Sequence, residues 1–364
     1  MPKNNFKRLL IAPLDWGLGH TARSVPIIRW LRLSGHHVVF AGNEWQRAFI
    51  DSSIAGIETI HINGYDVRYG TQKGWEKAAL IAQIPRLQKA IKAEHAWLQK
   101  AAAEIRPDAI ISDNRYGLWH TGIPSVIITH QLQVQTGAGS IITRAIQKAH
   151  YRYLQHFGAV WVPDVAASPG LAGALSHCPS LPANTTYIGL LSQFEAPAAT
   201  VAGNHLLVLL SGPEPQRSLL ADVLLQQLRH YAGKVVFVAG SYSAAQPHGL
   251  PEHMEYHATA TGARLEAFIR DASLVVCRSG YSTLMDLVRL RKKALLIPTP
   301  GQTEQIYLAK SLQKRGIYPY AQQHGLKLQQ ELQRAMALPD NLPEFDNAYH
   351  LFEKMAGDWL ERLP

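Results

Sequence analysis

The sequence predicts an α/β protein made of two consecutive doubly wound, Rossmann-like domains, each with a parallel β-sheet. Short apolar runs bounded by glycine, proline or aspartate alternate with helical patterns, which is typical of parallel strands buried between helices. The order strand, glycine-containing loop, helix opens the chain and recurs near residue 205, after a stretch without periodicity. With 364 residues, 47% of them hydrophobic and 17% charged, the chain can form two ordinary cores and is neither disordered nor fibrous.

The first domain opens with a strand, a helix and a second strand in close succession. Residues 8–12 form an apolar run, a loop with two glycines follows, residues 21–34 have helical periodicity, and residues 38–41 form a second run. This pattern predicts a βαβ unit. Later runs of the same kind continue the sheet as buried parallel strands, at residues 109–112, 125–128 and 159–162.

A second domain follows residues 163–204, where prolines, glycines and serines interrupt the periodicity as in a linker. The elements expected after it are strands over 206–210, 234–239, 274–277 and 294–297, a turn at 211–215 and a helix over 216–230. We therefore expect one Rossmann-like domain over residues 1–195, a second over 203–340, and a helix in 341–364 that packs back on the first domain. Because open parallel sheets bind ligands beyond the carboxyl ends of their strands, the domains are expected to face each other across a cleft.

The composition excludes several classes of protein. The two cysteines, Cys178 and Cys277, are about a hundred positions apart, so neither a disulfide framework nor a Cys-x-x-Cys zinc site is expected. No apolar run reaches the roughly 20 residues that span a bilayer, and the amino terminus lacks the apolar core of a signal peptide. These features indicate a cytoplasmic protein. Basic residues exceed acidic ones by nine, and seven of that excess falls in residues 1–200, which favours an anionic partner.

The loop after the first strand places His20 at the start of a helix. Gly17 and Gly19 lie where the backbone must turn sharply between strand and helix. The amides and dipole of a helix start favour a nearby anion and disfavour protonated imidazole, so His20 would stay neutral and could accept a proton. The alternative is that His20 caps the helix or fills a pocket.

The segment after the strand at 274–277 has the features of a diphosphate site. Ser279, Gly280 and the amides that follow open a helix and can bind a pyrophosphate, which Arg278 could neutralise. Asp286 lies three residues after Thr283, about one helical turn, so its carboxylate could accept two hydroxyl groups of a ribose. Ser279 and Thr283 could also be helix caps, and capping is compatible with ligand binding.

The loop after the strand at 294–297 offers polar side chains for a sugar. Two prolines and a glycine lead into a helix that opens with Gln302, Thr303, Glu304 and Gln305. Because a buried hydroxyl left unpaired is costly, such side chains can discriminate between sugars. The alternative is an ordinary connection in which Gln302 and Thr303 are solvated.

These motifs together resemble glycosyltransferase family 28. The resemblance rests on Arg278-Ser279-Gly280 with Thr283 and Asp286, then Ile297-Pro298, then Gln302 to Gln305 with Ala309. The Gly17 to His20 loop and the Ser211-Gly212 loop fall where this family has its other two glycine-rich loops. The order of elements agrees over nearly the whole chain.

The resemblance implies a GT-B fold, an inverting mechanism, no metal, no cofactor, and a UDP-sugar co-substrate held mainly by the C-terminal domain. It implies roles by position on the donor: Ser279 and Thr283 would contact phosphate, Asp286 the ribose, and Leu265 would lie near the nucleobase. Glu304 and Gln305 would contact the donor sugar, and His20 the reacting hydroxyl. Ser211, Gly212, Gln302 and Thr303 complete the donor site. Asp286 stands where the peptidoglycan enzymes of the family have glutamate, and the first loop lacks their paired glycines.

Single displacement needs a base and a stabilised leaving group. The departing diphosphate gains negative charge, which helix-start amides and Arg278 can stabilise. His20 is our first candidate for the base, and Asp113, after the strand at 109–112, is the second. Asp113 could instead cap a turn or pair with Arg115. Candidates for the acceptor site are Asn114, Arg115 and His130, although His130 could equally be a buried, hydrogen-bonded histidine.

Residues 73–106 form a largely helical stretch that is both basic and apolar. Such a helix can lie on an anionic membrane, where a lipid-linked acceptor would be found, so peripheral contact with the inner face of the cell membrane is expected. The alternative is an ordinary packing helix with a solvated basic face.

The function expected from these features is transfer of a sugar, such as an N-acetylhexosamine, from UDP to a membrane glycolipid or cell-envelope precursor. Two alternatives stay open. One is a nucleotide-sugar hydrolase of the same fold, with water as the acceptor, and the other is a non-catalytic nucleotide-binding protein. No aromatic-interleaved basic motif of a nucleic-acid module occurs, so no nucleic-acid partner is expected.

Overall fold

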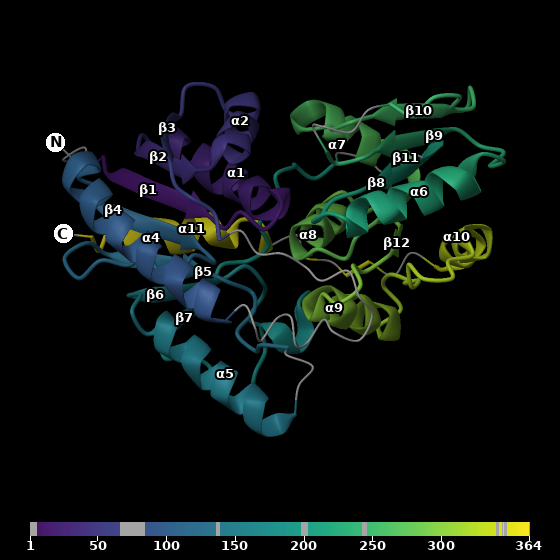
Figure 1. Cartoon of the computed structure of the whole chain (residues 1–364). Helices are drawn as coiled ribbons and strands as arrows, with labels where there is room; N and C mark the ends of the chain where they lie inside the picture. The colour runs from purple at the N-terminus through teal and green to yellow at the C-terminus, as the bar shows by residue number, and fades with distance from the viewer. Residues whose placement is uncertain are drawn as a thin grey trace. The chain divides into compact units, whose positions relative to one another are not determined.

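The computed structural model describes residues 6–65, 84–135, 139–197, 203–241, 246–339, 342–343, 345 and 348–363. These residues fall into two compact units, one formed by 6–65, 84–193 and 345–363, and the other by 194–343. Both units are α/β, with helices packed on a parallel sheet (Figure 1). In the described part of the chain, no helix is both long and apolar enough to cross a membrane.

The first unit is built on a seven-stranded parallel sheet in the order β3-β2-β1-β4-β5-β6-β7. Its strands are β1 (Arg8–Pro13), β2 (His37–Gly42), β3 (Glu58–His61), β4 (Ala109–Asp113), β5 (Ser125–Ile128), β6 (Ala159–Val162) and β7 (Thr185–Tyr187). Its helices are α1 (Leu18–Leu33), α2 (Glu44–Ser53), α4 (Ile84–Ile105), α5 (Ser140–Leu154), α11 (Leu351–Leu360) and the short 3-10 helix η1 (Gly173–Leu175).

The second unit has a five-stranded parallel sheet in the order β10-β9-β8-β11-β12. Its strands are β8 (His205–Leu209), β9 (Val235–Val238), β10 (Met254–His257), β11 (Ala272–Cys277) and β12 (Ala294–Leu296). Its helices are α6 (Gln216–Leu228), α7 (Gly262–Arg270), α8 (Tyr281–Arg289), α9 (Thr303–Lys314) and α10 (Leu328–Ala337).

Both sheets have the doubly wound order, in which the chain starts in the middle of the sheet, builds outward and then reverses direction. The reversal lies between β1 and β4 in the first unit and between β8 and β11 in the second. A crevice at the carboxyl ends of these strands is where doubly wound sheets bind ligands. In the first unit the strand register pairs Pro13 with Asp113, so the loop after β1 meets the end of β4 at this point. The predicted fold class of two parallel-sheet α/β domains is confirmed.

The strands that the sequence patterns missed are the edge strands β3 and β10, together with β7 at the other edge of the first sheet. Their residues are mostly half-buried, and they carry polar side chains rather than apolar runs. An edge strand pairs on one side only, so its sequence lacks the signal of a strand buried on both faces. Strand β7 lies inside residues 163–204, which we expected to be linker. Helix α1 also begins earlier than expected, at Leu18 rather than residue 21, so His20 lies inside its first turn.

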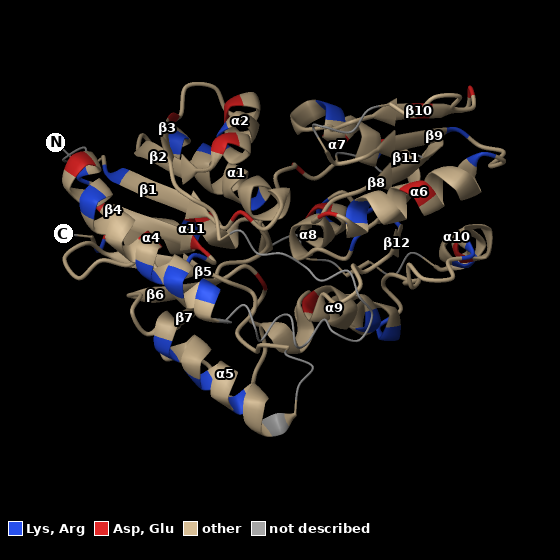
Figure 2. Ribbon diagram, viewed as in Figure 1, with Lys and Arg blue, Asp and Glu red and all other residues tan. Residues whose placement is uncertain are grey.

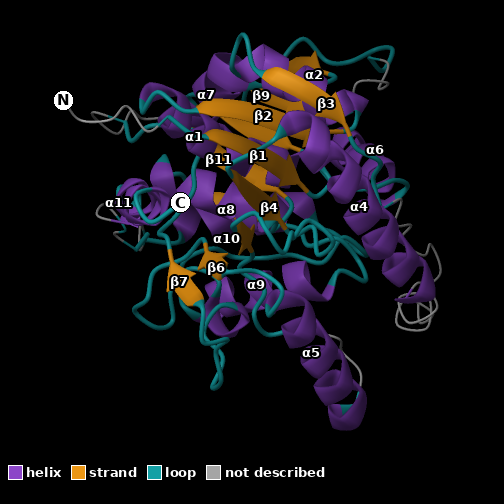
Figure 3. Ribbon diagram, turned by 90° about the vertical axis from the view of Figure 1, so that its left-hand side faces the viewer, coloured by secondary structure: helices purple, strands orange, loops and turns teal. Residues whose placement is uncertain are grey.

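Helix α11, near the C-terminus, packs on the first unit through aromatic edges. The ring of Phe352 lies 5.5 Å from Trp30 of α1 and 6.0 Å from Trp161 of β6, both nearly perpendicular to it. Trp359 makes the same kind of contact with Trp161, at 5.2 Å between ring centroids. Figure 3 shows α11 on the same side as the chain's C-terminus, away from α4 and α5. Burial of these rings therefore fixes the last helix to the first sheet.

Replacing Phe352 by alanine should destabilise the first unit by about 3–5 kcal/mol, because it removes a buried ring and leaves a cavity between Trp30 and Trp161. Urea denaturation followed by tryptophan fluorescence would measure the loss. Glu353→Ala, on the exposed face of the same helix, is the matched control and should change stability by no more than about 0.5 kcal/mol. Equal effects of the two substitutions would contradict the packing role of α11.

Candidate functional site

In the first unit, the loop after β1 is held against the ends of β1 and β4. Gly17 forms the N-cap of α1 with a φ of 87°, a left-handed conformation that favours glycine, and Gly19 lies in the helix's first turn. The buried side-chain amide of Gln46 donates to the carbonyls of Pro13 and Leu14, at 3.3 and 3.2 Å. The same amide also lies 3.1 Å from the hydroxyl of Thr21, the residue after His20. These bonds set the direction in which the first turn of α1 presents its side chains.

His20, Arg23 and Asp113 form one polar cluster. The Nδ1 atom of His20 lies 2.9 Å from Oδ1 of Asp113 and 2.8 Å from Nη2 of Arg23. Arg23, one turn after His20 on α1, donates from Nε to Oδ2 of Asp113 at 2.5 Å and from Nη2 to Oδ1. The guanidinium and the carboxylate therefore form a bidentate ion pair beneath the imidazole.

Asp113 in this cluster is a carboxylate that stays charged. Burial alone would raise its pKa, but the charges of Arg23 and His20 and their hydrogen bonds outweigh burial and bring the pKa down to about 2. The side chains of Arg23 and Asp113 are 1% exposed, whereas that of His20 is 16% exposed. Of the two predicted candidates for a base, His20 is therefore the one whose ring reaches the surface, and Asp113 is its buried partner.

His130 belongs to the same cluster, on the far side of Arg23 from the carboxylate. It follows β5, is almost fully buried, and its Nδ1 atom lies 3.4 Å from Nη1 of Arg23. The sequence placed His20, Asp113 and His130 after three different strands, and the structure brings them together around Arg23. We did not predict Arg23 as a site residue. Its spacing of three residues from His20, which puts both on one helix face, is the signal that could have found it.

Arg115 has a partner other than the expected Asp113. It forms a buried ion pair with Glu94 of α4, at 2.7 Å between Nη1 and Oε1, and its Nε donates to the carbonyl of Pro13 at 2.8 Å. Glu94 also accepts a hydrogen bond from the hydroxyl of Tyr65, at 2.7 Å. These bonds tie β4 to the loop after β1. Asn114, with a φ of 55°, forms the turn between Asp113 and this network.

In the second unit, Arg278 ties together the loops at the ends of three adjacent strands. Its guanidinium, 1% exposed, donates from Nη2 to the carbonyl of Gln216 at 2.7 Å. From Nη1 it donates to the carbonyls of Ile297 and Pro298, at 3.1 and 3.3 Å. No carboxylate of the described residues forms an ion pair with it. Burial lowers the pKa of Arg278 to about 10, which still leaves the guanidinium charged at neutral pH.

Helix α8 begins directly after Arg278 with an open N-terminus. Its N-cap is Gly280, no side chain caps it, and its first turn holds no acidic residue. A side chain added at Gly280 would meet no atom within 4 Å, so the backbone here is open to approach. The dipole of α8 and the buried charge of Arg278 act at the same point, and both favour an anion.

Ser279 and Gln305 join α8 to the loop before α9. The buried hydroxyl of Ser279 donates to the carbonyl of Gln305 at 2.8 Å, and the side-chain oxygen of Gln305 accepts the amide of Thr299 at 2.9 Å. These two predicted ligand contacts are thus engaged in holding the loops. Thr283, half-buried in the first turn of α8, is better placed to contact a ligand.

The other predicted donor-site residues lie in loops after the strands of the second sheet or on the helices that follow those loops. Gly212 has a φ of 101°, so the loop of Ser211 and Gly212 needs a glycine there. Gln302 is the N-cap of α9, and Thr303 and Glu304 lie in that helix's first turn. Asp286 is buried on α8, and Leu265 is buried on α7.

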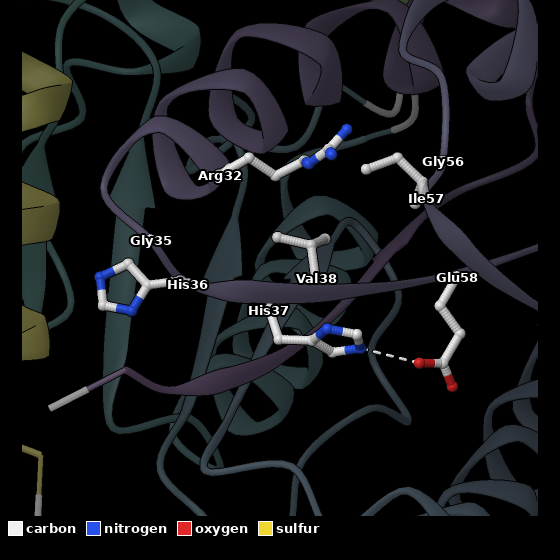
Figure 4. Close-up of a pocket in the computed structure, with 8 residues that line it drawn as sticks. All are labelled: Arg32, Gly35, His36, His37, Val38, Gly56, Ile57 and Glu58. Carbon is white, nitrogen blue, oxygen red and sulfur yellow. Dashed lines mark hydrogen bonds and ion pairs between the residues drawn. The ribbon is translucent and has the colours of Figure 1, made fainter. Parts of the chain in front are cut away.

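A separate hollow in the first unit lies at the amino ends of the strands, at the other end of the sheet from the His20 cluster. It has a volume of about 250 Å³ and is lined by residues at the starts of β2 and β3, among them His36, His37 and Glu58, with Arg32 above them (Figure 4). Nε2 of His37 lies 2.8 Å from Glu58, which also pairs with Arg8. Because it opens at the amino ends of the strands, this hollow is not part of the His20 cluster. Among the residues described, no group of three or more His, Cys, Asp or Glu side chains is arranged to hold a metal ion.

Comparisons with known proteins show what this chain is similar to. Residues 216–356 match the model of the glycosyltransferase family 28 C-terminal domain. The chain is 26% identical over 311 residues, 78% of its length and 74% of the relative's, to the UDP-N-acetylglucosamine–N-acetylmuramyl-(pentapeptide) pyrophosphoryl-undecaprenol N-acetylglucosamine transferase of Marinobacter nauticus.

Two solved structures share the fold over almost the whole chain. The glycotransferase of kitacinnamycin superimposes with a TM-score of 0.68 at 16% identity, covering 99% of this chain and 100% of that one. Acinetobacter baumannii MurG superimposes with a TM-score of 0.54 at 14% identity, covering 98% and 99% of the two chains.

Proposed function

We propose that this chain, a glycosyltransferase of the GT-B fold with a family 28 C-terminal domain, transfers a sugar from a UDP-sugar to an acceptor hydroxyl with inversion at the anomeric carbon. The second unit binds the diphosphate of the donor, and the first unit supplies the base. The observation that carries the proposal is the buried, carboxylate-free Arg278 at the open start of α8.

The anion that suits the start of α8 is a diphosphate. A buried guanidinium without a carboxylate leaves a net positive charge, and the α8 amides add donors directed at the same place. Gly280 lets a phosphate approach the backbone, and Thr283 adds a hydroxyl in the first turn. Arg278 acts through its charge, because its Nη1 and Nη2 atoms already donate to loop carbonyls. The site therefore stabilises the charge that develops on the leaving diphosphate.

The nucleoside and sugar of the donor are proposed by similarity. The relative from Marinobacter nauticus is named as a transferase of N-acetylglucosamine from its UDP derivative. In this chain Asp286 would hold the uridine, with Leu265 near its nucleobase. Glu304, in the first turn of α9, would accept hydrogen bonds from hydroxyl groups of the sugar. We infer a UDP-N-acetylhexosamine donor.

His20 is the proposed base. The oxygen of the acceptor hydroxyl attacks the anomeric carbon while the bond from that carbon to the diphosphate oxygen breaks, and the electron pair leaves with UDP. The hydroxyl proton moves to Nε2 of His20, whose Nδ1 atom faces the ionised Asp113. Asp113 orients the ring and does not itself take the proton, because its pKa of about 2 makes it a poor acceptor at neutral pH.

The acceptor is proposed to be a lipid-linked glycan precursor at an anionic membrane. Residues 73–83 of the stretch that suggested membrane contact lie outside the described residues, and the remainder is α4. Helices α4 and α5 of the first unit are both rich in lysine and arginine (Figure 2). Their exposed basic residues are Arg86, Lys89, Lys92, Lys100, Arg144, Lys148 and Arg152, and Glu104 is the exposed acidic residue on them.

The two helices are linked by stacked rings and carry exposed apolar residues. His95 of α4 stacks on Trp119, which stacks on His156 just after α5, each at 4.3 Å between centroids. Ile141 and Ile142, in the first turn of α5, are 80% and 46% exposed. Exposed isoleucines beside a predominantly basic surface suit the headgroup region of anionic lipids.

Gly280→Ala should abolish UDP binding without unfolding the protein. Its φ of −71° suits alanine and the added methyl meets no neighbour, but it would occupy the space of the diphosphate. In a thermal-shift assay, UDP at about 100 times its dissociation constant should add about 2.7 kcal/mol to the wild type and nothing to the variant. GDP and dTDP are the comparison nucleotides. Full stabilisation of Gly280→Ala by UDP would contradict the diphosphate site.

His20→Gln should lower turnover about 10²–10⁴-fold while leaving UDP stabilisation intact, because it removes a general base but no donor contact. Steady-state rates with UDP-N-acetylglucosamine and a lipid-linked acceptor, beside the UDP thermal shift, separate the two effects. Rapid release of UDP and free sugar by the wild type without an acceptor would identify a hydrolase instead. A variant with wild-type turnover would remove His20 as the base.

Membrane binding should depend on α5. The double variant Ile141→Ser/Arg144→Gln should weaken cosedimentation with vesicles that contain anionic phosphatidylglycerol about tenfold, because it removes both an inserted side chain and a charge. Leu33→Ser, which changes an 88% exposed leucine at the end of α1, is the control and should bind as the wild type does. Equal binding to neutral and anionic vesicles would argue against this surface.

A further inference from the structure

Arg23 lies directly beside His20, the proposed base. Its Nη2 atom lies 2.8 Å from Nδ1 of His20, and Oδ1 of Asp113 lies 2.9 Å from that same Nδ1 atom. A full positive and a full negative charge thus face one ring nitrogen at nearly equal distance. A carboxylate alone would favour the protonated imidazole, and a guanidinium alone would disfavour it.

We propose that Arg23 is a positioning residue that sets the protonation of His20, cancelling the pull of Asp113 so that the imidazole remains a free base at neutral pH. This inference rests on the proposed role of His20. Asp113 still orients the ring of His20, because its oxygen can accept a hydrogen bond from that ring.

The hydrogen-bond geometry gives Arg23 a second effect on the ring. Nδ1 of His20 can donate to Asp113 or accept from Arg23, but a single nitrogen of a neutral imidazole cannot do both. When Nδ1 donates to Asp113, Nε2 carries the lone pair and can take the acceptor proton. When Nδ1 accepts from Arg23, the proton sits on Nε2 and the ring cannot act as a base through that atom. The bidentate contact with Asp113 engages the guanidinium and so favours the first arrangement.

Burial and the neighbouring elements strengthen the influence of Arg23 and Asp113 on the protonation of His20. Arg23 and Asp113 are buried, so solvent screens their charges little. The groups that face the ring come from different elements: Arg23 from α1 itself, Asp113 from the end of β4, and, behind Arg23, His130 from the loop after β5. The N-terminal dipole of α1 also disfavours a charged imidazole in the first turn, in the same direction as Arg23.

The test is a titration of His20 by NMR in the full-length protein labelled at histidine, with the His20 signal among the 17 histidines assigned from its loss in His20→Gln. Removing the cation in Arg23→Gln should move the titration midpoint of His20 upward by about 1–3 pH units, and removing the anion in Asp113→Asn should move it downward. The double variant Arg23→Gln/Asp113→Asn should titrate within about half a unit of the wild type, because the two charges cancel.

Arg23→Lys tests charge against geometry, since lysine keeps the positive charge but cannot make the bidentate contact. Its His20 midpoint should stay near that of the wild type. The acid limb of the turnover profile should follow the NMR midpoint in each variant, so Arg23→Gln should lose more activity at pH 6 than at pH 8.

Two results would overturn the inference: an unchanged His20 midpoint in Arg23→Gln, or, if that variant does not fold, a midpoint in Asp113→Asn that is equal to that of the double variant. A purely structural Arg23 would lower turnover equally at all pH values and leave the midpoint in place. Because the NMR titration needs no substrate, it reads the effect of Arg23 even if His20→Gln keeps full turnover, so failure of this inference and failure of the proposed base are distinguishable.

Discussion

Buried guanidinium groups at the carboxyl edges of the two sheets organise both candidate sites. Arg23, Arg115 and Arg278 are the largest fully buried side chains of the described structure. A charge removed from water must be matched by hydrogen bonds or an opposite charge, so each arginine draws several chain segments toward itself. Each of the three lies beside a loop that follows a central strand, and each fixes that loop.

What differs between the units is the partner of the guanidinium. In the first unit Arg23 and Arg115 pair with the carboxylates of Asp113 and Glu94, and each pair is neutral as a whole. In the second unit Nη1 and Nη2 of Arg278 donate to three carbonyls, which do not neutralise the charge of the guanidinium. In the proposed reaction, a neutral surrounding suits a histidine that must accept a proton, and a positive one suits a diphosphate that must leave. Buried guanidinium groups would thus support both the proton transfer and the departure of the leaving group in one displacement.

Much of the fold could be predicted from the sequence, because strands that are buried on both faces appear in the sequence as unbroken apolar runs. The runs at residues 109–112 and 274–277 are the central strands β4 and β11. Strand β7, with the sequence Thr-Thr-Tyr, carries no such run and was hidden in an apparent linker. For the candidate site, the residues after the strand ends were predicted from their position, since parallel strands bring their carboxyl ends together. Arg23 lies inside a helix, and only its contact with Asp113, ninety positions away, shows that it belongs to the cluster around His20.

The sequence by itself determined the doubly wound class of both units, the strand ends at which polar residues collect, and the positions of His20, Asp113 and Arg278. These follow from local patterns, because periodicity and glycine placement act over a few neighbouring residues. Only the tertiary structure decided who pairs with whom: Arg115 with Glu94 rather than Asp113, Ser279 with the carbonyl of Gln305, and Arg278 with no carboxylate of the described chain. Pairing of buried charges depends on distances between segments far apart in the chain, and those distances are set by sheet register and packing.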